Sequence, residues 1–180
     1  MIEKILLNLL WILPFLTVLF SIPIKENSPK LKRFHLASAG VVLLSSIYLL
    51  IQVFQNTISN TSSQIQLLYE TKLNWLNAIS AKYFIGIDAL SSMMLVLAAI
   101  IIFTGILATW RLEKGQKVFL GFFQILAASV YGVFISFDLV LFFVFYEMEA
   151  LCMYLLIAGY GSGNKDYGAK KLTLTLAIGS

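Results

Sequence analysis

The chain has 180 residues, of which 59% are hydrophobic and only 12% are charged, and its mean hydropathy is +0.88. Soluble domains carry about twice that share of charged residues, so the composition excludes a soluble enzyme and indicates one compact helical membrane unit. The net charge of +4 comes from basic residues between apolar runs, which excludes the basic face of a nucleic-acid-binding protein.

Five apolar runs are long enough to cross a bilayer, whose hydrocarbon core of about 30 Å needs about 20 helical residues. The first run contains Pro14, which neighbouring helices tolerate in a membrane. A sixth run, 169–180, would extend only about 18 Å as a helix, so we expect a truncated sixth helix and a chain that is a fragment. The five predicted membrane helices are 5–24, 36–54, 90–110, 118–137 and 139–160.

The charges of the connections predict the topology. Ten of the 13 Lys and Arg residues follow the first, third or fifth helix, and three lie on the opposite side. Cytoplasmic loops carry the excess of basic residues, so we expect the N-terminus outside. The long connection 55–89 is then external, with a weak strand signal in the alternating Ile65, Leu67 and Tyr69. The predicted fold class is an all-α membrane protein, a polytopic bundle of five complete helices and a truncated sixth.

Two aspartates stand directly before predicted helices. Asp88 precedes the helix 90–110 and Asp138 precedes the helix 139–160. An acidic side chain at this position accepts hydrogen bonds from the free N–H groups of the first turn. We therefore expect both aspartates to be N-caps rather than site residues.

The sequence offers no residues for redox chemistry or metal binding. Cys152 is the only cysteine, so it can form no intrachain disulfide, and it lies in an apolar run without a neighbouring histidine. His35 is the only histidine, and we expect it to be an interfacial side chain near Lys32 and Arg33. We expect no cofactor and no metal in this chain.

The fifth apolar run contains two carboxylates. Glu147 lies about 12 Å beyond Leu139, near the bilayer centre, where a charged carboxylate costs about 2.5–3.5 kcal/mol. Residues two apart on a helix point about 200° from each other, so at most one of Glu147 and Glu149 is expected to line a hydrated path. Intramembrane acids mark ion or proton routes, which favours a functional Glu147 over a neutral structural one. For Glu149 the two interpretations are balanced.

Four segments of the chain form a recognisable series of motifs. They are residues 83–91 (YFIGIDALS), 142–147 (FFVFYE), 153–157 and 169–172. In this order they resemble the antiporter-like membrane subunits of proton-pumping NADH–quinone oxidoreductase (respiratory complex I), subunit M among them. In that family the first segment corresponds to the G-[IVL]-D-G-[IL]-S start of the third helix and the second to an F-F-x-F-[WY]-E run. Mrp sodium/proton antiporters and membrane-bound hydrogenases share this family.

The resemblance implies a function and a set of partners. Glu147 corresponds to the fifth-helix glutamate, which in the family is coupled to a lysine on the seventh helix, and Lys171 aligns with a lysine early in the sixth. The implied role is a non-redox, proton-translocating subunit (a translocase) in the bacterial inner membrane, beside neighbouring antiporter-like subunits. NADH, FMN, iron–sulfur clusters and quinone are expected on other subunits. Residues 1–180 would form the N-terminal part of one antiporter-like domain.

The chain departs from the family at three positions, and alternatives stay open. Ala89 replaces a glycine, Glu149 replaces an apolar residue and Cys152 replaces a proline. Because the partner lysine is absent, the fragment alone is expected to be inactive. The same helices would also suit an Mrp-type cation/proton antiporter or a membrane hydrogenase subunit. A non-transporting structural membrane protein or a gene remnant is the alternative of a different class.

Overall fold

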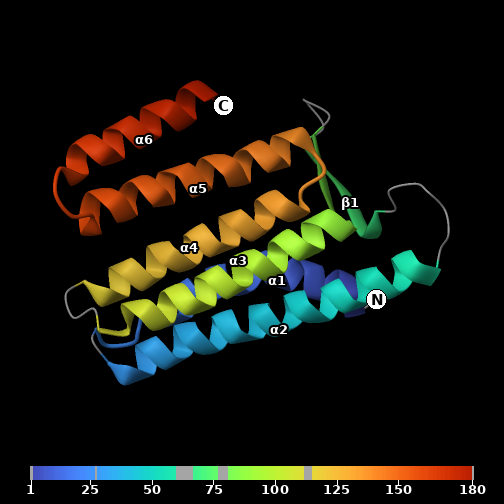
Figure 1. The fold of residues 1–180 in the computed structure, drawn as a ribbon, viewed down its shortest axis with the longest axis horizontal. Helices are drawn as coiled ribbons and strands as arrows, with labels where there is room; N and C mark the ends of the chain where they lie inside the picture. Colours follow the sequence, from blue (N-terminus) through green and yellow to red (C-terminus); the bar gives the residue numbers. More distant parts are fainter. Residues whose placement is uncertain (1, 27, 60–66, 77–80, 112–114, 180) are drawn as a thin grey trace.

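The structure is a computed structural model that describes residues 2–26, 28–59, 67–76, 81–111 and 115–179. Six long helices lie side by side in this part of the chain, and a two-stranded hairpin stands at one end of the bundle (Figure 1). The helices are α1 (Ile2–Ser21), α2 (Pro29–Ser59), α3 (Ala89–Ala108), α4 (Gln116–Ile135), α5 (Leu139–Tyr160) and α6 (Lys165–Gly179).

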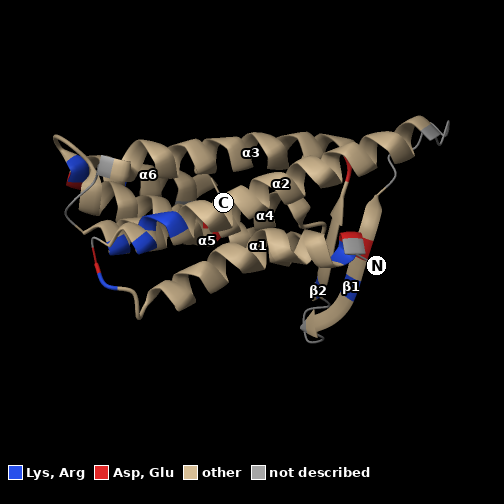
Figure 2. Cartoon of the chain, turned by 90° about the horizontal axis from the view of Figure 1, so that it is seen from below, with Lys and Arg blue, Asp and Glu red and all other residues tan. Residues whose placement is uncertain are grey.

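Five of the described helices, α1 to α5, are long and apolar enough to cross a membrane. This confirms the predicted helical membrane fold with its five spans. The basic residues gather mainly at the end of the bundle away from the hairpin (Figure 2). The predicted topology is based on this distribution of basic residues. The location of the N-terminus on the outer side stays a prediction.

The second helix begins well before the predicted residue 36. α2 starts at Pro29, and the Ser28 hydroxyl accepts a hydrogen bond from the backbone N–H of Leu31 at 3.2 Å. Proline suits the first position of a helix and serine suits the cap before it, so local chemistry sets this start rather than hydropathy. The helix therefore carries Lys32, Arg33 and His35 in its first two turns.

α4 is the central helix of the bundle. Over its membrane-length window 56% of the residues are buried, compared with 22% for α5. α1 and α3 pack against α4 and lie on either side of it in Figure 2, while α5 packs on a further side. The core around α4 includes Leu7, Leu95, Ala127 and Tyr131. α5 consequently keeps much of its surface free of contacts within the described chain.

A β-hairpin replaces part of the predicted external loop. Strand β1 (Leu68–Leu76) pairs antiparallel with β2 (Ala81–Ile87), with Leu73 opposite Tyr83. The weak strand signal is right for Tyr69 only: Leu67 lies outside the strand, and Ile65 lies outside the described residues. The predicted all-α fold does not include this hairpin. Pairing between two strands depends on contacts between separate segments, and the hydrophobic pattern of a single segment does not predict such contacts.

The hairpin is attached to the connection between α4 and α5. The backbone N–H of Phe137 donates to the carbonyl of Phe84 at 2.9 Å, and Ile85 forms a bridge with Ser136. The Ile85 and Ile87 side chains are both fully buried. These contacts fix the point at which α5 begins, and with it the depth of the carboxylates on that helix.

Candidate functional site

Both predicted aspartate caps are confirmed. Asp138 Oδ1 accepts hydrogen bonds from the backbone N–H groups of Val140 at 3.0 Å and Leu141 at 3.2 Å, so it caps α5. The hydrogen bond from the Lys82 backbone N–H, and then those from the helix, hold the pKa of Asp138 below its usual value. Asp88 Oδ1 likewise accepts from the backbone N–H of Ser91 at 2.7 Å and caps α3.

Glu147 lies on a groove between α5 and α6, called here the α5–α6 groove. It is half-buried, about 12 Å along α5 from Leu139, and within the described chain it has neither a hydrogen bond nor an ion pair. The groove has a volume of about 500 Å³, and α6 contributes Thr173 to its wall. The other lining residues are Phe143, Val144, Met148, Ala150, Leu151 and Tyr154. The groove is therefore mainly apolar, and its polar side-chain groups are the Glu147 carboxyl and the hydroxyls of Tyr154 and Thr173.

Glu149 lies on a different groove, walled by α3, α4 and α5 and called here the α3–α4–α5 groove. The groove has a volume of about 320 Å³, and Glu149 shares the α5 wall with Met153. The other walls are apolar, with Leu97 and Ile101 on α3 and Phe123 on α4 among them. The two glutamates therefore open onto separate spaces, as their spacing on the helix predicts.

The structure does not bring Lys171 to Glu147. Lys171 is exposed on α6, and its Nζ lies 5.9 Å from the ring centroid of Tyr167 on the same helix. Among the described residues that line the α5–α6 groove, Thr173 is the one from α6. The role of Lys171 in proton transfer stays a prediction.

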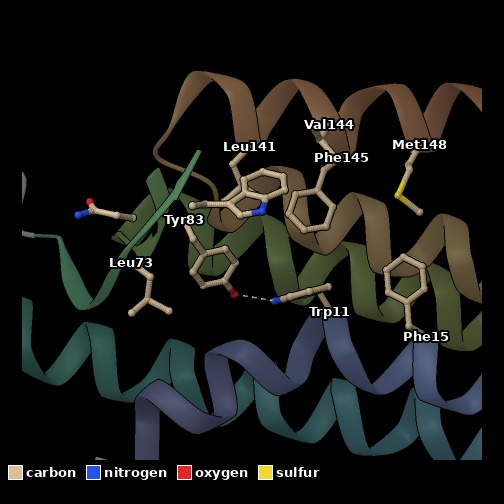
Figure 3. Close-up of a pocket in the computed structure, with 10 residues that line it drawn as sticks. Trp11, Phe15, Leu73, Tyr83, Leu141, Val144, Phe145 and Met148 are labelled. Carbon is tan, nitrogen blue, oxygen red and sulfur yellow. Dashed lines mark hydrogen bonds between the residues drawn. The ribbon is translucent and has the colours of Figure 1, made fainter. Parts of the chain in front are cut away.

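A third cavity lies between α1, the hairpin and α5 (Figure 3). Its volume is about 510 Å³, and aromatic and aliphatic side chains line it. Trp11 Nε1 donates to the Tyr83 hydroxyl at 3.2 Å, and that hydroxyl donates to Asn8 Oδ1 at 2.6 Å. Burial raises the pKa of the Tyr83 phenol. Sequence analysis missed this network, because no local pattern links α1 to a strand more than 70 residues away.

The expectation of an interfacial His35 is wrong. Its side chain is fully buried, and neither ring nitrogen has a hydrogen-bond partner within the described chain. The early start of α2 places His35 inside the helix, beside α4, where Gln124 Nε2 donates to the His35 backbone carbonyl at 3.2 Å. Cys152 is also buried, and the described residues contain no cluster of three potential metal ligands.

No protein-family model matches the chain, but comparison with known sequences finds relatives named NAD(P)H-quinone oxidoreductase chain 4. NAD(P)H-quinone oxidoreductase chain 4 1 of Picosynechococcus sp. is 32% identical over 139 residues, which cover 77% of this chain and 26% of the relative. Chain 4 2 of Microcystis aeruginosa is 28% identical, covering 97% and 31%. The chloroplastic chain 4 of Mesostigma viride is 32% identical, covering 93% and 32%. The chain thus spans about a quarter to a third of the length of these relatives.

Solved structures share the fold. A chain of respiratory complex I from Thermus thermophilus with bound NADH superimposes with a TM-score of 0.76 at 21% identity, covering 96% of this chain and 33% of that one. A chain of the membrane-bound sulfane sulfur reductase, an archaeal respiratory membrane complex, gives 0.75 at 17% identity, covering 99% and 34%. The arrangement of helices described above is therefore that of a membrane chain in respiratory complexes.

Proposed function

We propose that the chain is part of an antiporter-like, proton-translocating membrane subunit of an NADH–quinone oxidoreductase, in the subunit M position. The relatives named NAD(P)H-quinone oxidoreductase chain 4 support the complex. The observation that carries the transport role is the half-buried Glu147 carboxyl at the middle of α5, open to the α5–α6 groove.

The chemistry of this carboxyl suits proton transfer. Intramembrane carboxyl groups mark proton relays in pumps and transporters. A carboxyl group that opens onto a groove can pass a proton to or from a group that comes within hydrogen-bond reach in that groove. Glu147 is the proton-transfer group in this proposal, and Lys171, in the second turn of α6, is the second candidate.

The protein is a multi-pass membrane protein, and the other parts of the proposal follow from its place in a complex. The chain itself would bind no redox cofactor; NADH, FMN, iron–sulfur clusters and quinone would be bound by other subunits. Its partners would be neighbouring antiporter-like subunits and lipid. We place it in a bacterial inner membrane, although one relative of similar identity is chloroplastic.

The test is the substitution Glu147→Gln in the full-length protein, assembled in its native complex. Inverted membrane vesicles report proton uptake through a pH-sensitive dye and electron transfer through NADH oxidation. We expect proton uptake per NADH to fall about tenfold or more, because a positioned proton-transfer group contributes about 10²–10⁴-fold to rate. Glu70→Gln is the matched control, since Glu70 pairs with Lys72 at 2.7 Å on the hairpin, outside the membrane helices. Normal uptake in an intact Glu147→Gln complex would refute the proposal.

A second candidate is a membrane subunit of another respiratory complex or of an Mrp-type antiporter. The fold shared with the sulfane sulfur reductase chain favours this alternative. Transport that requires sodium ions, or that proceeds without NADH as electron donor, would identify it in the same vesicles.

A further inference from the structure

His35 is a buried polar side chain that takes no part in the proposed proton transfer. A neutral imidazole carries one N–H donor and one acceptor nitrogen. Both ring nitrogens of His35 lack a partner within the described chain, although the residue is 0% exposed. Buried polar groups in folded proteins are almost always hydrogen-bonded, either to protein or to ordered water. Because the side chain is already fully enclosed, its partner must be small enough to be enclosed with it.

The His35 side chain points from α2 toward α4. On the same helix, the hydroxyls of Ser38 and Thr17 hydrogen-bond at 2.6 Å, so Ser38 marks the side of α2 that faces α1. Gly40 marks the side that faces α3, since a Cβ there would meet an α3 side chain at 3.7 Å. At about 100° per residue, His35 lies between these two directions. Gln124 Nε2 of α4 also donates to the His35 backbone carbonyl at 3.2 Å, which confirms that α4 stands on this side.

α1 contributes Ser21 to the same place. α1 runs opposite to α2 and α4 (Figure 1). On α1, Thr17 faces α2 through its bond to Ser38, whereas Val18 faces α4, because its Cγ1 lies 3.8 Å from a Cβ built on Gly121. Ser21 follows one turn later and lies between these two directions. It is 3% exposed, and its hydroxyl donates to the Val18 carbonyl at 2.7 Å, so its oxygen lone pairs remain available to accept a hydrogen bond.

The two polar side chains lie at one depth, beside a small space next to Gly121. His35 and Ser21 each lie one turn from the hydrogen-bonded pair of Ser38 and Thr17, toward the end of the bundle away from the hairpin. Gly121 likewise lies one turn from the glutamine that reaches α2. It is buried, yet a Cβ built on it meets no described atom closer than 3.8 Å. The space therefore admits a group of methyl size, which is also about the size of one water molecule.

Water suits the groups around this space better than other small ligands. It both donates and accepts, so it can bond the imidazole and donate to the Ser21 oxygen. A buried water makes about three hydrogen bonds, and the Gln124 amide has a second N–H beyond the one that it gives to the His35 carbonyl. A metal ion would find too few ligands, since the described residues hold no group of three His, Cys, Asp or Glu. An apolar guest would leave the imidazole unpaired.

We propose that His35 holds an ordered water molecule at the α1–α2–α4 junction, the space enclosed by His35, Gln124, Ser21 and Gly121. The water bridges the first turns of α2 to α1 and α4 at the end of the bundle away from the hairpin. The site is independent of the proposed proton transfer, because Glu147 lies on the α5–α6 groove.

A density map of the full-length protein in its native complex, at a resolution that shows ordered water, gives the direct test. We expect a peak about 2.7–3.2 Å from one ring nitrogen of His35 and at a similar distance from the Ser21 oxygen. A junction without such a peak, or a protein side chain bonded to the imidazole in its place, would overturn the proposal.

The substitution Gly121→Ala tests the site in solution. If the space holds water, the added methyl expels it and leaves His35 unpaired, so the apparent melting temperature of the full-length protein in detergent should fall by about 2 °C or more. A space without water predicts the opposite sign, because the methyl fills it and alanine favours the helix. Gly159→Ala is the matched control, since Gly159 is exposed on α5 and its added Cβ meets nothing within 4 Å. A melting temperature of Gly121→Ala at or above that of the wild type would contradict the water site.

The same substitution in a His35→Leu background shows which group the water serves. Leucine needs no hydrogen-bond partner, so Gly121→Ala should lose its effect or become stabilising there. An equal loss in both backgrounds would mean that the methyl acts by crowding its neighbours, which would overturn the proposal. Where His35→Leu does not fold, the density map and the comparison of Gly121→Ala with the wild type decide the matter.

Discussion

Asp138 Oδ2 accepts a hydrogen bond from the backbone N–H of Lys82 at 3.2 Å, so the residue that caps α5 also holds strand β2. The same carboxylate receives the first-turn N–H groups of α5 through Oδ1. One side chain thus links the hairpin to the helix that carries Glu147 and Glu149. Its charge state sets how firmly the hairpin end of α5 is held.

Acid is expected to weaken this link. The folded-state pKa of Asp138 is lowered, so its contribution to stability is present above the unfolded-state pKa of about 3.9 and is lost as the pH falls through the folded value. Thermal unfolding of the detergent-solubilised protein, followed by circular dichroism between about pH 7 and pH 3, measures this. Asp138→Asn keeps a capping oxygen and should lose less stability on acidification than the wild type. An equal loss in both proteins would show that other carboxylates cause it.

Gly132 allows a close contact between α4 and α5. A Cβ at this position would lie 2.4 Å from the ring of Phe145, which is 4% exposed and cannot move out of the way. We expect Gly132→Ala to destabilise the protein by about 1–3 kcal/mol, as overpacking does in cores. Gly159→Ala is the control, because no atom lies within 4 Å of its added Cβ and alanine favours the helix. Equal melting temperatures for the two variants would contradict the packing argument.

The Tyr83 hydroxyl joins α1 to the hairpin, and its removal should be measurable. Tyr83→Phe leaves Trp11 Nε1 and Asn8 Oδ1 without this partner, so we expect a loss of about 1 kcal/mol in the free energy of unfolding. Chemical denaturation in mixed micelles reports it. Tyr167→Phe makes the same chemical change at a side chain that is 67% exposed and should be neutral. A neutral Tyr83→Phe would mean that water replaces the hydroxyl.

Gly115 adopts a left-handed backbone conformation, with φ of 64°, at the start of α4. Its carbonyl accepts a hydrogen bond from the Tyr160 hydroxyl at 2.5 Å, and an added Cβ would lie 2.6 Å from that oxygen. Gly115→Ala should therefore cost more than the roughly 1–2 kcal/mol of a left-handed alanine. Gly163→Ala isolates the backbone cost, since its φ is 69° and its added Cβ meets nothing within 4 Å. Melting temperatures of both variants give the comparison.

Hydropathy was sufficient to predict the five membrane helices, because the bilayer sets their length and composition. Local chemistry at single residues explains the rest of the agreement: Asp88 and Asp138 cap as expected, and the 200° between Glu147 and Glu149 separates their grooves. The failures concern contacts between distant segments. His35 is buried because α2 begins earlier than predicted. No sequence pattern within a single segment predicts that β1 pairs with β2.

The hydrogen bonds from β2 to the α4–α5 connection have a mechanical consequence. Strand β2 holds Phe137 and Asp138 at once, so pulling α5 away from α4 at the end next to the hairpin would have to break the strand contacts as well. The α5–α6 seam has no such strand across it within the described chain. Under force applied in single-molecule pulling, or during slow extraction by harsh detergent, α6 is the helix that would detach first, while α4, α5 and the hairpin would come apart together.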